Sequence, residues 1–168
     1  RDFSYFNDMR LAAHSDFEAF PDEESLESGY NPFRLDLNGF WKFRYDRNPA
    51  CAVKDFEKDD YCTDGWEDIS VPSSIQMEGF GKPQYTNVQY PWDAREEIGP
   101  GEIPEYFNPV ASYVKYVTLP KHFAGRRVFI SFQGTEGGMA LWCNGSFAGY
   151  STDSFTPHEF ELTSLLHS

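Results

Sequence analysis

The sequence of 168 residues has little cysteine, little positive charge and no long hydrophobic run. Its cysteines, Cys51, Cys62 and Cys143, are odd in number and lack CxxC spacing, which argues against a disulfide framework or a zinc site and predicts buried free thiols. Lysine and arginine number 14 against 27 aspartates and glutamates, so the formal net charge is −13. An acidic surface repels phosphate and anionic lipid, and no apolar stretch reaches the roughly 18 residues of a membrane span. We therefore expect no nucleic-acid partner and no membrane partner.

The sequence also lacks the common catalytic motifs. It contains no GxSxG nucleophile elbow, no HExxH motif and no phosphate-binding loop. Its four histidines are scattered without metal-ligand spacing. Glu96 and Glu97 are adjacent, and neighbouring side chains on an extended chain point to opposite faces, so these carboxylates are not expected to act together as acid and base. The residues therefore predict no catalytic residue and no cofactor in this chain.

Aromatic residues, by contrast, make up 18% of the sequence, which excludes a disordered chain. The 13 glycines and 11 prolines lie in short clusters that divide the chain into small elements, as in an all-β domain. The strongest local signal is Asn144-Gly145, which favours a two-residue hairpin turn between residues 139–143 and 146–150. Alternating apolar residues predict further strands at 40–45, 69–71, 113–119, 128–132 and 160–162.

Two parts of the chain depart from this strand pattern. Residues 1–33 show no sustained periodicity and are predicted to form an extended lead-in arm before a domain at residues 34–168. Segments 73–97 and 99–111 are rich in proline, glycine and aromatics, and loops of that length are usually functional. Short strands joined by turns and a few long loops predict a β-sandwich of the jelly-roll type.

Several ordered motifs make the chain resemble the amino-terminal sugar-binding domain of glycoside hydrolase family 2. These motifs are LNGFWKF at 37–43, ISVPSSIQM at 69–77 and LWCNG at 141–145. Two further strings, YTNVQYP at 85–91 and GYSTDS at 149–154, are similar to the β-galactosidase branch of that family. The resemblance covers nearly the whole chain, and the order and separation of the motifs make it specific.

The resemblance implies a galactose-binding-domain-like jelly roll that precedes an immunoglobulin-like domain and a TIM barrel. Enzymes of this kind hydrolyse terminal non-reducing β-galactose residues with retention, and their two catalytic glutamates belong to the barrel, so the isolated domain is expected to be inactive. A further strand follows Leu166 in the family, and the sandwich is therefore expected to be incomplete at its carboxyl end. The resemblance also implies sodium and magnesium in the full-length enzyme, and a homo-oligomer.

Two residues carry over as expected substrate contacts. Asn87 matches the family asparagine whose amide reaches into the active site, and an amide can both donate to and accept from sugar hydroxyls. Asp153 matches the family aspartate that accepts from galactose hydroxyls and is linked to a sodium ion, which binds only with the barrel present. Turn statistics alone favour a turn for Asn87 and an Asx turn or cap for Asp153, but the matching context favours the substrate role. Trp142 is expected to pack in the core, and Trp92 lies in a long loop.

Two alternative interpretations stay open. The domain could act as a stand-alone carbohydrate-binding module, which would bind galactose or lactose without further domains. It could also serve mainly in assembly, as an interface domain of a β-glucuronidase or β-mannosidase relative. The sequence is compatible with either a cytoplasmic or a periplasmic location.

Overall fold

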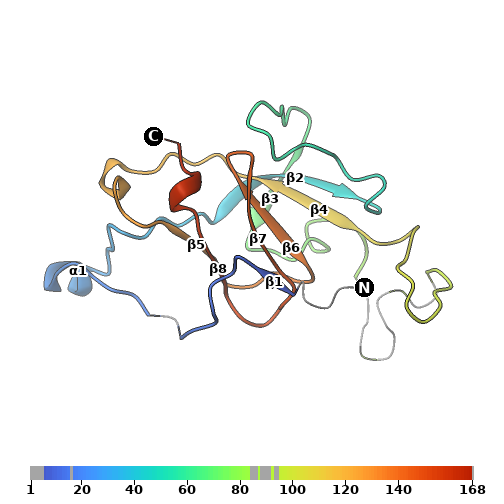
Figure 1. Ribbon diagram of the computed structural model, residues 1–168, viewed down its shortest axis with the longest axis horizontal. Coiled ribbons are helices and arrows are strands. Elements are labelled where there is room, and N and C mark those ends of the chain that lie inside the picture. Colours follow the sequence, from blue (N-terminus) through green and yellow to red (C-terminus); the bar gives the residue numbers. More distant parts are fainter. Residues whose placement is uncertain (1–5, 16, 84–86, 88–91, 93–94, 168) are drawn as a thin grey trace. The chain divides into compact units, whose positions relative to one another are not determined.

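The computed structural model describes residues 6–15, 17–83, 87, 92 and 95–167, and its strands are antiparallel (Figure 1). The chain forms two compact units. Unit 1 comprises Arg1–Leu35, Glu57–Tyr61 and Thr118–Ser168, and unit 2 comprises Asp36–Phe56 and Cys62–Val117.

Unit 2 contains a three-stranded sheet in the order β3-β2-β4, formed by β2 (Gly39–Asp46), β3 (Glu67–Val71) and β4 (Val110–Val114). Phe43 lies on the central strand, is 1% exposed, and packs against the rings of Phe80 and Tyr113 at centroid distances of 4.6 and 4.8 Å. Phe40 is 71% exposed, as expected for an aromatic outside the buried face of a half-buried strand. The predicted strands at 40–45 and 69–71 are confirmed.

The strand predicted at 113–119 is displaced, because β4 ends at Val114. Its pairing with β2 stops at Lys42, and the Lys115 ammonium then donates to the Phe40 carbonyl oxygen at 2.8 Å. A side chain thus contacts β2 where continued pairing would have placed backbone. Alternation in the sequence reports a pleated, half-buried chain, and it does not report where the partner strand ceases to pair.

Unit 1 contains a sheet in the order β1-β7-β6 and a separate strand pair, β5-β8. The strands are β1 (Asn7–Asp8), β5 (Phe129–Phe132), β6 (Met139–Cys143), β7 (Ser146–Ser151) and β8 (His158–Glu161). The predicted hairpin is confirmed, since Asn144 and Gly145 both have positive φ, at 49° and 75°. The Asn144 amide also donates to the Leu165 carbonyl oxygen at 2.8 Å, which attaches the turn to the 3₁₀ helix η2 (Thr163–Leu165).

Gly149 lies where the β6–β7 register shifts, beside the core of unit 1. Its φ is +153°, and an added Cβ would stand 2.5 Å from the Phe160 ring and 2.7 Å from the Asp8 carbonyl oxygen. Phe160 itself is 0% exposed. Only glycine therefore allows β7 to approach both the core ring and strand β1 this closely.

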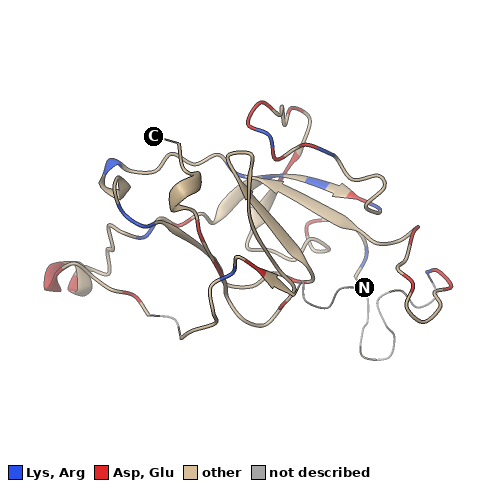
Figure 2. Ribbon diagram, viewed as in Figure 1, with Lys and Arg blue, Asp and Glu red and all other residues tan. Residues whose placement is uncertain are grey.

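The amino-terminal segment contains a helix that its lack of periodicity did not predict. Helix α1 (Glu23–Ser28) begins after Asp22, whose carboxylate accepts from the Ser25 N–H at 2.8 Å, and it ends at Gly29 in the left-handed conformation. The acidic residues Glu23 and Glu24 lie in its first turn, where their negative charge interacts favourably with the positive end of the helix dipole (Figure 2). The prediction of an extended arm therefore misses one capped helical segment. A second short 3₁₀ helix, η1, spans Lys121–Phe123.

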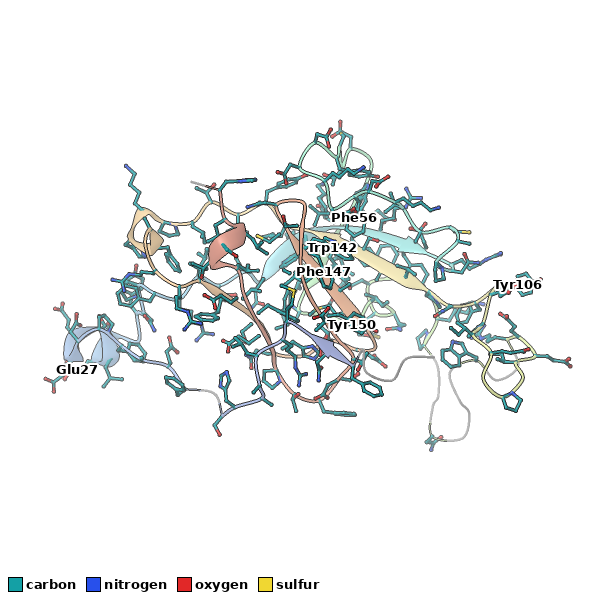
Figure 3. The ribbon with its side chains drawn as sticks, in the orientation of Figure 1. Glu27, Phe56, Tyr106, Trp142, Phe147 and Tyr150 are labelled. Atoms are coloured by element: carbon teal, nitrogen blue, oxygen red, sulfur yellow. The ribbon has the colours of Figure 1, made fainter. Side chains whose placement is uncertain are left out.

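Two predictions about burial are wrong. Trp142 is 38% exposed and meets Phe147 edge to face at 5.7 Å on the β6–β7 hairpin, so it is not a core residue (Figure 3). The cysteines are free as predicted, but Cys51 and Cys62 are exposed and only Cys143 is partly buried. Among the described residues, no helix is long and apolar enough to cross a membrane.

Candidate functional site

Asp153 lies in the turn that joins β7 to β8. Its carboxylate accepts hydrogen bonds from the Phe155 N–H, at 2.9 Å, and from the Thr156 hydroxyl. The Arg10 guanidinium approaches the same carboxylate, with Nη1 3.8 Å from Oδ2. The local geometry is thus the Asx turn that residue statistics favour, and it fixes the direction of the carboxylate while leaving its side chain 34% exposed.

The donors around Asp153 keep it ionised. The Thr156 hydroxyl and then the Phe155 N–H hold the pKa of the Asp153 carboxyl below its usual range against some desolvation, and Arg10 acts in the same direction. A carboxylate that is charged, oriented and partly exposed is a strong acceptor for sugar hydroxyls. This arrangement is chemically suited to the substrate contact predicted for Asp153.

A buried histidine supports the backbone of the same turn. His158 is 0% exposed, and its Nε2 contacts the Asp153 carbonyl oxygen. Because a carbonyl oxygen can only accept, Nε2 is the donor in this contact. Within the described part of the chain, Nδ1 has no hydrogen-bond partner. His158 holds the main chain of Asp153, a role that the scattered histidines gave no reason to predict.

Asn87 is an exposed turn residue of unit 2, and the residues next to it, 84–86 and 88–91, lie outside the described part. Trp92 is also exposed, and its carbonyl oxygen accepts from the Arg95 N–H at 3.0 Å. Asn87 thus lies in a turn, as residue statistics favour. The described residues nearest to it are Pro83 before it and Trp92 after it. Asn87 and Asp153 belong to different units, so each is placed only among the neighbours of its own unit.

Glu96 organises the segment that follows this loop. Its carboxylate accepts from three successive backbone N–H groups, those of Glu105 at 2.6 Å, Tyr106 at 2.8 Å and Phe107 at 3.2 Å. Desolvation raises the pKa of Glu96, but the three donors together bring it below its ordinary value. The Arg95 guanidinium adds a contact over the Phe107 ring, 4.9 Å from its centroid. Glu96 is a structural acceptor, a role that its position beside Glu97 did not suggest.

The described residues do not form a complete site for a metal ion. No group of three or more His, Cys, Asp or Glu side chains there could hold one. The Asp153 carboxylate is a hard oxygen ligand of the kind that sodium and magnesium prefer, but it is a single ligand with Arg10 beside it. Among the described residues, Asp153 thus offers a single carboxylate and not a complete cation site.

Comparison with known families places this architecture in a defined class. The model of the family described as "Glycosyl hydrolases family 2, sugar binding domain" matches residues 34–168, so the chain belongs to this family. The predicted all-β, jelly-roll β-sandwich class and the resemblance drawn from the motifs are both confirmed.

Individual relatives are named β-galactosidases. The chain is 48% identical to a β-galactosidase of Halalkalibacterium halodurans and 43% identical to one of Streptococcus thermophilus, in each case over 97% of this chain and 16% of the relative. It is 37% identical to a β-galactosidase large subunit of Leuconostoc lactis, over 94% of this chain and 27% of that protein. The chain thus spans about 16% of the length of the first two relatives.

Proposed function

We propose that this chain is the sugar-binding domain of a retaining β-galactosidase and that Asp153 and Asn87 contact the terminal galactose. The observation that carries the proposal is the Asp153 turn, in which an ionised, partly exposed carboxylate is fixed by Phe155 and Thr156. A galactosyl group presents neutral hydroxyls, which an anionic acceptor and an amide bind in complementary ways. The names of the relatives support galactose as the sugar.

Catalysis is assigned to other domains of the same enzyme. Retention requires an acid/base and a nucleophile whose carboxyl groups stand about 5 Å apart across the bond. In this proposal an immunoglobulin-like domain and a TIM barrel complete the enzyme, and the barrel supplies both groups. The enzyme is a homo-oligomer that uses magnesium and sodium. Asp153 provides one carboxylate ligand to the sodium ion, whose positive charge would strengthen binding of the sugar hydroxyls.

The proposal is tested with the full-length protein and three aryl glycosides. We expect hydrolysis of o-nitrophenyl β-galactoside with retained configuration, and much slower hydrolysis of the matching β-glucuronide and β-mannoside. Replacing Asp153 by Ala is expected to raise the KM for the galactoside. Activity confined to the glucuronide or mannoside, or an unchanged KM in the Asp153 variant, would overturn the proposal.

A further inference from the structure

We propose that Arg10 is a positioning residue for the sugar contact of Asp153, and that residues 6–14 form part of the sugar site rather than only a lead-in. This inference rests on the proposed function of Asp153. It assigns to the amino-terminal segment a role in substrate binding that neither the motifs nor the family description contains.

The side chain of Arg10 connects two residues of the strand and turn that carry the site. Its Nη1 donates to the Ser151 hydroxyl at 3.0 Å and lies 3.8 Å from Asp153 Oδ2. The Arg10 side chain is only 9% exposed, whereas that of Asp153 is 34% exposed. A charge withdrawn from water interacts more strongly with its neighbours than an exposed one, and a planar guanidinium fixes direction as well as charge. Arg10 is therefore placed to restrain the Asp153 carboxylate from its buried side.

The backbone of the segment is paired with the strand that leads into Asp153. In β1, Asn7 lies opposite Ser151 and Asp8 lies opposite Tyr150. The Thr152 hydroxyl continues this contact by donating to the Phe6 carbonyl oxygen at 3.2 Å. The three residues that immediately precede Asp153 thus all meet the segment.

The same segment reaches the strand that follows the turn. Arg10 forms a backbone bridge with Phe160, and the Leu11 N–H donates to the Glu159 carbonyl oxygen at 2.9 Å. Further along, His14 Nε2 lies 2.6 Å from the Glu159 carboxylate. Residues 6–14 therefore contact both strands that flank the Asp153 turn, and Arg10 lies between the two sets of contacts.

This geometry predicts how substrate binding responds to loss of Arg10. A contact to a sugar hydroxyl that is the same in the bound substrate and the transition state contributes to KM and not to kcat. Replacing Arg10 by Gln removes the positive charge and the planar guanidinium. Asp153 then keeps only its donors within the turn, the Phe155 N–H and the Thr156 hydroxyl. We expect the KM for the galactoside to rise about tenfold, within the range of coupling found for neighbouring polar residues, with kcat nearly unchanged.

The experiment is a double-mutant cycle in the full-length protein with o-nitrophenyl β-galactoside. The variants are Arg10→Gln, Asp153→Asn and the two combined, with Arg10→Lys as a variant that keeps the charge. The matched control is Arg127→Gln, because Arg127 also pairs with a carboxylate, that of Glu161 at the end of β8, at 2.7 Å, but its side chain is 67% exposed. Thermal unfolding shows whether each variant is folded. If Arg10→Gln does not fold, Arg10→Lys takes its place in the cycle.

The outcomes separate this inference from the proposed function. If Arg10 acts through Asp153, the combined variant has the KM of Asp153→Asn alone, Arg10→Lys is intermediate, and Arg127→Gln matches the parent protein. Additive effects of Arg10 and Asp153, or a fall in kcat without a change in KM, would overturn the role of Arg10 and leave Asp153 standing. An unchanged KM in Asp153→Asn would overturn the proposed function itself, together with the role of Arg10.

Discussion

Asp153 and Asn87 occupy turns that are built in different ways. The Asp153 turn is fixed directly, by donors to its carboxylate, by His158 at its carbonyl oxygen and by Arg10 from a distant part of the chain. Before Asn87 in the chain, Phe80 packs on Phe43, and after it the Glu96 carboxylate accepts from the Glu105 and Tyr106 N–H groups. The Asp153 carboxylate is thus held by contacts to its own atoms, whereas the described contacts near Asn87 lie at either end of its loop.

The difference follows from the cost of burying charge. A carboxylate that is drawn partly out of water needs donors within reach, or its pKa rises and it loses its charge. An amide has no charge to protect and can remain on an exposed turn. We therefore expect substitutions near the Asp153 turn and near the Asn87 turn to have unequal effects on stability and on substrate affinity.

The largest effect is expected from the two glycines that precede these turns. In Gly149→Ala the new methyl group meets the Phe160 ring and the Asp8 carbonyl oxygen, neither of which can move freely. We therefore expect the free energy of unfolding to fall by about 1–3 kcal/mol, or the protein to fail to fold. In Gly81→Ala, where φ is +69°, the methyl group meets only the end of the Tyr45 side chain, and the cost is that of the left-handed backbone, about 1 kcal/mol. Urea unfolding measures both. Equal losses would contradict the distinction between a packed strand and an anchored loop.

The second effect concerns substrate affinity. A hydrogen bond to a charged group is worth more than a neutral one, so Asp153→Asn is expected to raise the KM for a β-galactoside by roughly 10- to 100-fold and Asn87→Ala by roughly 3- to 10-fold. Steady-state kinetics of the full-length protein measures both variants under identical salt conditions. A larger effect from Asn87 than from Asp153 would reverse the order of the two contacts.

The third effect is local to the segment held by Glu96. In Glu96→Gln one carboxylate oxygen becomes an amide donor that faces backbone N–H groups, so we expect roughly tenfold faster hydrogen exchange at residues 105–107. Glu97→Gln is the matched control, since Glu97 is adjacent and exposed. Exchange detected by mass spectrometry should change for the first variant only, and an identical pattern in both would remove the anchoring role.

The smallest effect is a pH dependence of stability in unit 1. Hydrogen bonds from Arg127 and Thr163 lower the pKa of Glu161 from 4.5 to about 2. Because the pKa of Glu161 is lower in the folded state, its ionised carboxylate stabilises the fold. This stabilisation is complete above a pH of about 4.5 and is lost as the pH falls toward about 2. We expect Arg127→Gln to lower the thermal midpoint slightly at neutral pH, because the pair is exposed, and to approach the midpoint of the parent protein as the pH falls toward about 2. A parallel shift of the whole curve would show that the pair does not titrate in this way.

Local features of the fold were predictable, and contacts between distant segments were not. The Asn144-Gly145 hairpin depends on the φ preferences of two adjacent residues, which the sequence states directly. Helix α1 also carried local signals, Asp22 as its N-cap and Gly29 at its end, but at 6 residues it is too short for periodicity to reveal. Trp142 was misplaced because strand alternation does not say which face is covered.

The same division holds for the site. Motif context identified Asp153 and Asn87 as candidates, and turn chemistry explains the Phe155 and Thr156 donors. The partnership of Arg10 with Asp153 joins residues more than a hundred positions apart, and no local pattern contains it. The one local signal is that Arg10 stands among the apolar residues Met9, Leu11, Ala12 and Ala13, and a buried guanidinium requires an acidic or polar partner.

The Glu96 carboxylate also has a consequence for ions in solution. Three successive N–H groups that converge on one point form a concave anion receptor of the kind that captures phosphate or sulfate in other proteins. Here the Glu96 carboxylate already accepts from these three N–H groups, so they are not available to an anion from solution. Residues 105–107 thus receive their counter-charge from within the chain, through the Glu96 carboxylate.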